Sequence, residues 1–241
     1  MSRRLLIAAL LFSASTSAYA GSGLVEPTLK MTPHRDGAVH VAITLDACMG
    51  KTDHRILDTL VNEKIPATIF VTARWLKHNA DALAVMQSHP DLFEIENHGE
   101  NHVPAVDKPV SIYGIAAAGS AEAVKQEVEG GRLAIVAATG IQPQWFRGAT
   151  AKYTASSMAE INRLGMRVAG YSVNGDGGSL LGAAATAKHI ASARDGDVII
   201  SHINQPTHEA GEGVVKGLLA LKARGVIFTR LDDPAFAPPG N

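Results

Sequence analysis

Two histidines lie four residues apart, at His98 and His102, directly after the short apolar segment Leu92–Glu96. Imidazoles at this spacing can point at one ion from a helical turn or a tight loop. Two neutral imidazoles joined by a carboxylate, with open coordination positions, are typical of a catalytic site for zinc or a similar divalent metal. The pair therefore predicts a metal site, the alternative being two polar loop residues.

Other chemically active side chains stand where further short apolar segments end. These are Asp46, Arg147, Asp176 and His202. Active sites of parallel α/β proteins form at the carboxyl ends of strands, because the loops there converge. Taken singly, an aspartate can be a turn residue, an arginine a surface ion pair and a histidine a core residue. Their shared placement predicts one common site.

The elements that must position these groups alternate between strand and helix. Short apolar segments predict strands at 39–45, 67–71, 92–96, 144–147, 166–171, 198–201 and 226–230. Helical patterns fall between them at 54–64, 74–88, 120–138, 157–164, 183–193 and 214–224. Strands without clean polar–apolar alternation indicate burial on both faces, as in a parallel sheet. We predict a single-domain α/β fold, an irregular (β/α) barrel, with a doubly wound open sheet as the alternative.

Composition excludes several classes of protein. The 241 residues are 46% hydrophobic and 19% charged, which excludes a disordered or heptad-repeat chain. A formal charge of −1 gives no electrostatic reason to expect nucleic acid as a partner. The single cysteine, Cys48, excludes an intramolecular disulfide framework and a Cys-rich zinc module. We expect its thiol to be buried and inert.

The first twenty residues have the pattern of a secretory signal peptide. Arg3 and Arg4 precede the apolar run Leu5–Phe12, which is too short to cross a bilayer, and small residues lead to a cleavage site after Ala20. Removing this segment leaves a formal charge of −3, because it carries two of the 22 basic residues and none of the 23 acidic ones. We expect an exported protein, periplasmic or secreted, with no stable membrane span after cleavage. The alternative is a buried N-terminal helix. The expected organisation is a signal peptide (1–20), an entry segment (21–38), the main domain (39–232) and a Pro-rich tail (233–241).

The order of these motifs resembles that of the polysaccharide deacetylase family, also called carbohydrate esterase family 4 or the NodB-homology domain. The segments similar to its five motifs are Thr44–Ala47, His98–His102, Phe146–Gly148, Asn174–Asp176 and Ile200–His202. Ile65–Val71 is similar to the family's second strand, and the match covers about residues 39–230. The resemblance implies a distorted (β/α)7 barrel, similar to a TIM barrel.

The resemblance also implies a metal-dependent hydrolase. It would remove N-acetyl groups from an N-acetylglucosamine-containing glycan such as peptidoglycan or a chitin-like oligomer. His98 and His102 would hold a divalent metal, expected to be zinc. Asp46 would take the water proton and be held by Arg147, while His202 would protonate the leaving amine. Asp176 would orient the ring of His202.

The main departure from the family motifs is at Ala47. The family has a second carboxylate, its third metal ligand, where this chain has Ala47. Three possibilities stay open: Asp46 reaches the metal, Asp53 supplies the missing oxygen, or the site binds metal weakly. An N-cap role for Asp53 is the alternative to ligation.

We favour a working enzyme with an altered ligand set. The alternatives are a catalytically silent carbohydrate-binding relative and an amidase acting on a non-sugar amide. A transport-type binding protein is disfavoured, because nothing in the sequence indicates two similar lobes. Only 5% of the residues are aromatic, so few side chains can stack on a sugar. Trp145 is the expected platform, with core packing as the alternative.

Overall fold

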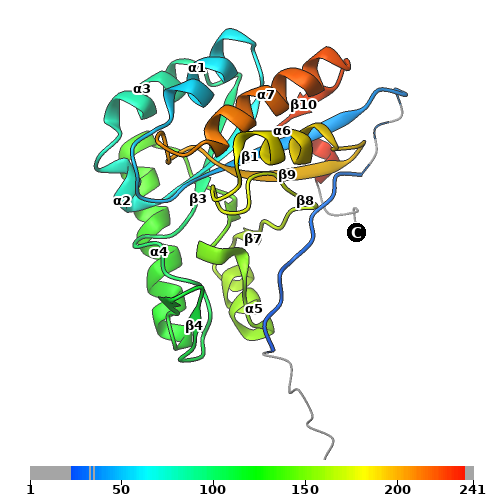
Figure 1. Cartoon of the computed structure of the whole chain (residues 1–241). Coiled ribbons are helices and arrows are strands. Elements are labelled where there is room, and N and C mark those ends of the chain that lie inside the picture. Colours follow the sequence, from blue (N-terminus) through cyan, green and yellow to red (C-terminus); the bar gives the residue numbers. More distant parts are fainter. Residues whose placement is uncertain (1–22, 33, 35, 237–241) are drawn as a thin grey trace, which may run out of the picture.

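Eight strands form one curled parallel sheet in the computed structural model, which describes residues 23–32, 34 and 36–236 (Figure 1). The strand order is β7-β6-β3-β2-β1-β9-β8, and β10 pairs with the amino-terminal half of β1. The strands are β1 (His40–Ala47), β2 (Ala67–Val71), β3 (Phe93–Asn97), β6 (Trp145–Phe146), β7 (Arg167–Val168), β8 (Val173–Asn174), β9 (Asp197–His202) and β10 (Ile227–Thr229). β1 is thus central, between β9 on one side and β2 with β10 on the other.

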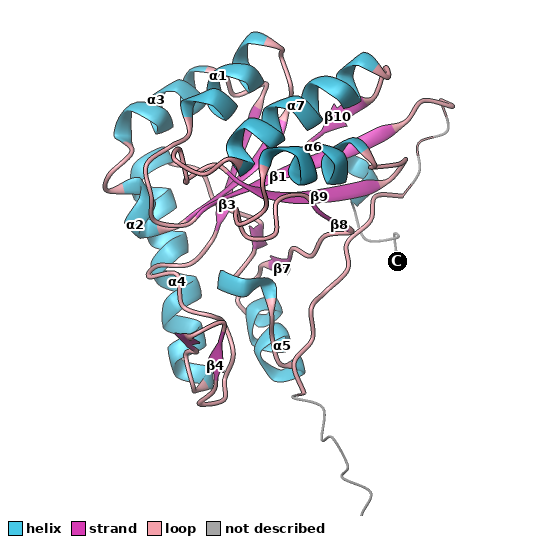
Figure 2. Ribbon diagram, viewed as in Figure 1, coloured by secondary structure: helices cyan, strands magenta, loops and turns pink. Residues whose placement is uncertain are grey.

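Helices cover the outer face of this sheet, as Figure 2 shows. They are α1 (His54–Asn62), α2 (Ala73–Leu76), α3 (Ala80–Ser88), α4 (Ala121–Thr139), α5 (Ala155–Arg163), α6 (Ala183–Ala191) and α7 (Ala210–Ala223). Short 3₁₀ turns occupy Ala149–Ala151 and Pro234–Phe236, and β4 (Ser111–Ile112) and β5 (Ile115–Ala116) form a separate antiparallel hairpin.

The alternation of side chains along β1 divides the core into two layers. Val41, Leu45 and Ala47 belong to the apolar cluster between sheet and helices. Ala42 belongs to the cluster inside the curl, where Trp145 also packs. Successive strand residues point to opposite faces, so Thr44 and Asp46 share the inner face with Ala42. The inner face is therefore where polar chemistry can be placed.

The sheet does not close, and the chain's entry segment lies across the opening between β7 and β8. Val25 forms an antiparallel bridge with Tyr153, and Lys30 forms one with Asp197. The contact is close at Gly170, where a β-carbon would lie 2.1 Å from the carbonyl oxygen of Pro27. The curled, incompletely closed sheet with flanking helices confirms the distorted barrel-like α/β fold in a single domain and differs from the doubly wound open sheet.

Three sequence-based expectations for the elements need correction. The strand expected at 166–171 is only Arg167–Val168, and β8 follows as a separate strand that was missed. The helix expected at 74–88 is broken into α2 and α3, because the Asn79 amide binds the loop after β1 instead of staying on a helix surface. The hairpin β4–β5 was missed, because strands of two residues carry no readable periodicity.

The expected signal peptide, residues 1–20, lies outside the described residues. Within the described part of the chain, no helix is both long and apolar enough to cross a membrane. The expected tail begins in an ordered turn, where Phe236 is buried and meets the ring of Trp145 edge to face.

Candidate active site

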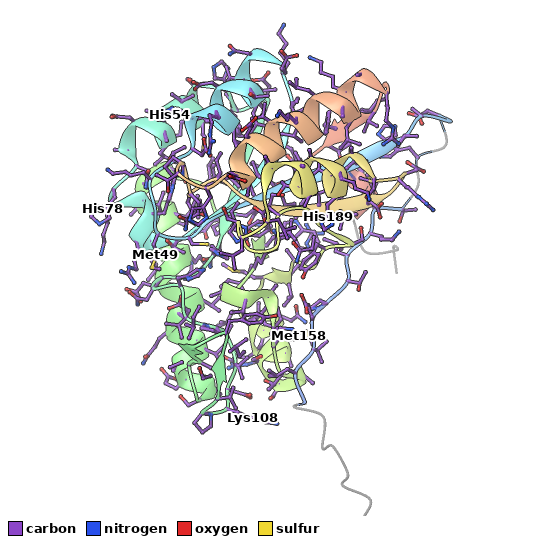
Figure 3. All side chains as sticks on the ribbon, viewed as in Figure 1. Met49, His54, His78, Lys108, Met158 and His189 are labelled. Atoms are coloured by element: carbon purple, nitrogen blue, oxygen red, sulfur yellow. The ribbon has the colours of Figure 1, made fainter. Side chains whose placement is uncertain are left out.

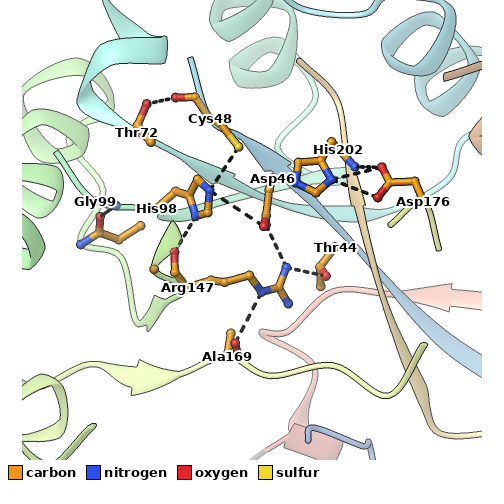
Figure 4. A network of polar contacts seen from close by, with 12 residues as sticks. Thr44, Asp46, Cys48, Thr72, His98, Gly99, Arg147, Ala169, Asp176 and His202 are labelled. Atoms are coloured by element: carbon orange, nitrogen blue, oxygen red, sulfur yellow. Dashed lines mark hydrogen bonds and ion pairs between the residues drawn. The ribbon is translucent and has the colours of Figure 1, made fainter. Parts of the chain in front are cut away.

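Asp46 and Arg147 form a buried ion pair at the carboxyl end of the sheet (Figure 4). Asp46 faces inward from β1, and Arg147 follows β6 with its side chain 0% exposed. Nη1 of Arg147 donates to Oδ1 of Asp46 at 3.0 Å and to Oγ1 of Thr44 at 2.9 Å. Nη2 donates to the carbonyl oxygen of Gly170 at 3.0 Å. The guanidinium therefore fixes one oxygen of the carboxylate and leaves the other free to face the cleft.

His98 and His102 lie on the loop after β3, with ring centroids 5.0 Å apart. Nδ1 of His98 lies 2.5 Å from the carbonyl oxygen of Arg147, which can only accept, so this nitrogen carries the proton. Nε2 of His98 therefore presents its lone pair to the site when the ring is neutral. His102 adopts a φ of 63°, an uncommon conformation for a residue with a β-carbon that is found at functional sites.

Glu127 of α4 positions this loop, a role that the sequence analysis missed. Its carboxylate accepts hydrogen bonds from the backbone of Asn101 and Val103. Gly99, which stands where the family motif has Ser or Thr, has a φ of 93°, and a β-carbon there would lie 2.3 Å from Oε1 of Glu127. Adjacent glycines at 130 and 131 let α4 approach the loop, since a β-carbon on Gly131 would lie 2.2 Å from Oδ1 of Asn97. Two neighbouring glycines inside a helix lower its stability, so their presence in the sequence indicates that another part of the chain packs closely there.

His202 and Asp176 form a second polar pair, from β9 and the loop after β8. Nδ1 of His202 lies 3.0 and 3.1 Å from the two oxygens of Asp176, and the backbone N–H of His202 donates to the same carboxylate at 2.7 Å. Nδ1 is thus the protonated nitrogen facing Asp176, and Nε2 is turned toward the cleft. Asp46 and His202 are paired neighbours across β1 and β9, so the two pairs share one site.

Cys48 also lies in this site, contrary to the expectation that its thiol is inert. It is buried, as expected, but Sγ lies 3.4 Å from Nε2 of His98. Among the described residues, Cys48, His98 and His102 form a group whose possible ligand atoms all lie within 4.8 Å of one another. A sulfur and two nitrogens are donors that suit a divalent zinc-like ion. These three residues can therefore hold a metal.

The charged groups of the site shift one another's pKa values. Burial raises the pKa of Asp46, but Arg147, His98 and His202 together outweigh it, so the pKa is lowered overall and Asp46 is a carboxylate. Burial likewise raises the pKa of the Cys48 thiol, but His98, with hydrogen bonds from His102 and His202, lowers it well below its usual range. Burial lowers the pKa of His98, but the Asp46 carboxylate, Cys48 and the hydrogen bond to the Arg147 carbonyl together raise it above the ordinary value.

Burial and the neighbouring carboxylate act on the pKa of His202 in opposite directions. Burial lowers the pKa, but the charge and hydrogen bond of Asp176, together with Cys48, raise it well above the ordinary value of a histidine. The raised pKa favours the protonated ring. A protonated imidazole beside a carboxylate is the arrangement that general acid–base chemistry needs.

A cleft of about 530 Å³ opens over these groups. It is lined by Asp46, Cys48, His98, His102 and His202 at its base. Its rim carries exposed apolar side chains: Tyr113 at the turn of the β4–β5 hairpin (78% exposed), Leu180 (81%) and Met49 (42%), which is labelled in Figure 3. The cleft therefore combines a polar floor with an apolar rim.

Two expected site residues do not reach the cleft. Asp53 is the N-cap of α1 and binds the backbone N–H of Arg55, while its two oxygens pair with the Arg55 guanidinium. Both oxygens of Asp53 are thus bound by Arg55, so the prediction that Asp53 ligates a metal is wrong. Trp145 is 4% exposed, lies under the guanidinium of Arg167 and donates Nε1–H to the carbonyl oxygen of Leu231. Trp145 precedes Arg147 by two residues and is buried inside the curled sheet, below the cleft. The prediction that its ring stacks on a sugar is therefore wrong.

Comparison with known proteins identifies the family. The sequence model described as polysaccharide deacetylase matches residues 34–169, more than half of the chain. The chain belongs to the polysaccharide deacetylase family. No curated protein sequence gave a significant match.

Solved structures of polysaccharide deacetylases share the fold. PdaA from Bacillus subtilis, a family 4 carbohydrate esterase, has a TM-score of 0.67 at 20% identity, covering 87% of this chain and 84% of PdaA. The peptidoglycan deacetylase PdaC from Bacillus subtilis has a TM-score of 0.65 at 17% identity, covering 81% of this chain and 89% of PdaC. A family 4 pseudoenzyme from Bacillus anthracis has a TM-score of 0.64 at 19% identity, covering 83% and 66%. The fold is thus compatible with active and inactive members.

Proposed function

We propose that this polysaccharide deacetylase is a metal-dependent hydrolase that removes N-acetyl groups from a glycan containing N-acetylglucosamine. One observation carries the proposal: Asp46 and His202, direct neighbours across β1 and β9, face one cleft beside the donor group Cys48, His98 and His102. A carboxylate and a protonated imidazole beside a metal-binding group are the parts that amide hydrolysis requires.

The protein's own groups divide the proton transfers between them. A divalent metal at the donor group, which we propose to be zinc, supplies a Lewis acid that activates water and polarises the acetamide carbonyl. The free oxygen of Asp46 accepts the proton of the attacking water, and Arg147 holds that carboxylate in its ionised form. Nε2 of His202 donates a proton to the departing amine nitrogen, while Asp176 fixes the ring through Nδ1. The C–N bond breaks, and acetate and the free amine leave.

The cleft rim supports a sugar substrate. Tyr113 presents an exposed aromatic ring beside the cleft, and an aromatic face buries apolar area of a sugar while tolerating its hydroxyl groups. We propose Tyr113 as the platform in place of Trp145. The peptidoglycan deacetylase PdaC among the similar structures supports peptidoglycan as a first substrate to test. The signal-like residues 1–20 support action outside the cytoplasm, where such a polymer is reached.

Acetate release tests the proposed function. Zinc-loaded protein is incubated with chitooligosaccharides, with peptidoglycan fragments and with simple acetamides, and acetate and new amines are quantified. Release from the glycans and not from simple amides is the expected result. Release from simple amides alone would instead identify an amidase of another specificity. Bound metal with no release from any substrate would overturn the hydrolase and identify a silent relative, as in the Bacillus anthracis pseudoenzyme.

A further inference from the structure

The direction in which each side chain at the end of β1 points indicates which residue can replace the family's second carboxylate as a metal ligand. The side chain of Ala47 is 0% exposed and packs in the helix-side cluster with Leu45. The side chain of Ala47 therefore points away from the site and contributes nothing to a metal. Cys48 is two residues beyond Asp46, and the alternation of side chains returns it to the inner face.

One separation within the donor group matches that of two ligands on a coordinated ion. With Zn–S of about 2.3 Å and Zn–N of about 2.0–2.1 Å, tetrahedral ligands lie about 3.5 Å from each other. Sγ of Cys48 and Nε2 of His98 are 3.4 Å apart, and the whole group lies within 4.8 Å. Asp46 does not belong to this group among the described residues: Arg147 binds one of its oxygens, and the other lies 3.9 Å from Nε2 of His98.

The surroundings of Cys48 hold its sulfur in the site. The thiolate, not the thiol, is the metal ligand, and Sγ of Cys48 faces Nε2 of His98. The carbonyl oxygen of Cys48 accepts a hydrogen bond from Oγ1 of Thr72, the N-cap of α2, which fixes the backbone just beyond β1. The sulfur is therefore held in place beside the imidazole of His98.

We propose that the Cys48 thiolate is the third protein ligand and, with His98 and His102, forms a His₂Cys centre that prefers Zn²⁺ and Co²⁺ to Mg²⁺ and Mn²⁺. Soft thiolate donors favour zinc-like ions, whereas carboxylates and water suit magnesium and manganese. The proposal rests on the proposed function for what the metal does in the reaction. It frees Asp46 to act as the base, since the thiolate completes the ligand set.

Cobalt spectroscopy of the full chain tests this ligation directly. Cys48 is the only cysteine, so any sulfur-to-cobalt charge-transfer band in the near ultraviolet must come from it. We expect the band in the Co²⁺-loaded protein and its absence in Cys48→Ser and Cys48→Asp. Competition with a chelator should give a Zn²⁺ affinity reduced at least about a hundredfold in Cys48→Ser. Cys48→Asp, which restores a carboxylate, should keep metal binding but lose the preference for Zn²⁺ over Mn²⁺.

Thiol labelling gives an independent measurement. We expect an alkylating reagent to modify Cys48 in metal-free protein and to be blocked stoichiometrically by Zn²⁺. Bound cobalt without the band, together with unchanged affinity in Cys48→Ser, would overturn the proposal. An acetyl-thioester on Cys48 in metal-free protein given substrate would also overturn it, because the thiol would then be a nucleophile. A charge-transfer band without acetate release would leave the ligation standing and reject only the hydrolase.

Discussion

Nη1 of Arg147 holds Oδ1 of Asp46 at 3.0 Å, while Oδ2 of Asp46 lies 3.9 Å from Nε2 of His98. The two carboxylate oxygens thus have different surroundings, one bound by a fixed cation and one facing the donor group. This division suits a base that must stay ionised and still accept a proton.

Asp46→Asn should lower kcat by about 10²–10⁴-fold, because the amide cannot take the proton of water. Metal content should stay at the wild-type level, since Cys48, His98 and His102 are intact. Steady-state kinetics and metal analysis measure the two effects. The control is Thr44→Val, which removes the other acceptor of Nη1 of Arg147 and should retain most of the activity. Equal losses in both variants would assign the effect to displacement of Arg147.

Asp176→Asn should move the alkaline limb of the kcat/KM profile to lower pH. The Asp176 carboxylate is the strongest influence raising the pKa of His202, so its removal lets the ring lose its proton earlier. Because the folded-state pKa is raised, the pair also stabilises the protein at low pH and loses this contribution as pH rises through that pKa. Asp58→Asn makes the same charge change on an exposed residue and should leave the profile unchanged. If the alkaline limb does not move in Asp176→Asn, the assignment of His202 as the general acid is wrong.

Tyr113→Ala should raise KM for glycan oligomers by about 5–10-fold, equivalent to about 1 kcal/mol of lost stacking, with little change in kcat. Tyr113→Phe keeps the ring and should behave nearly as the wild type. Trp145→Phe, in contrast, should lower the melting temperature and leave KM unchanged, because Trp145 packs under Arg167 inside the curl. A higher KM in Trp145→Phe alone would reverse these assignments.

Glu96→Gln should make stability less dependent on pH. Burial and the neighbouring Glu94 raise the pKa of Glu96 to about 9, while its oxygen accepts hydrogen bonds from the backbone of Gln144 and Trp145. Between the ordinary value of 4.5 and about 9, the folded protein holds a proton that the unfolded chain has released, so wild-type stability falls as pH rises.

Glutamine is always neutral and can accept the same two bonds. Thermal melts should show a variant stabilised at pH 8, by about 2–4 °C for each 1 kcal/mol, and little changed at pH 4. The exposed Glu122→Gln should follow the wild-type curve. A pH dependence that persists in Glu96→Gln would place its origin elsewhere.

The gathering of Asp46, His98, Arg147 and His202 was predictable, because parallel strands bring their carboxyl ends to one edge. Cys48 was misjudged, because a lone cysteine beside a strand reads as a small apolar residue. The two-residue spacing from Asp46 was the overlooked indication, since it puts both side chains on one face. The sequence does not show how far below the cleft a strand residue lies. Trp145 is only two residues from Arg147, but it is buried below the cleft.

Helix capping also limited what the sequence could give. An aspartate before a helix can cap the helix or point toward a metal. Which of the two occurs depends on the side chains that the fold places beside its carboxylate. Arg55 engages both oxygens of Asp53, and this pairing settled its place. Glu127 lies far from the motifs in sequence, so its hold on the histidine loop depends on how closely α4 approaches that loop.

The pairing of β1 with β9 makes assembly of the site a late, non-local event in folding. Asp46 and Cys48 are made early, whereas His202 belongs to a strand near the end of the chain. A chain ending after Val168 would carry the base and the three donors but lack the acid, and β1 would lose both β9 and β10 and become an unprotected edge. High contact order of this kind predicts slow folding. Strand β9 both carries His202 and covers the edge of β1, so a chain that lacks β9 has no working site.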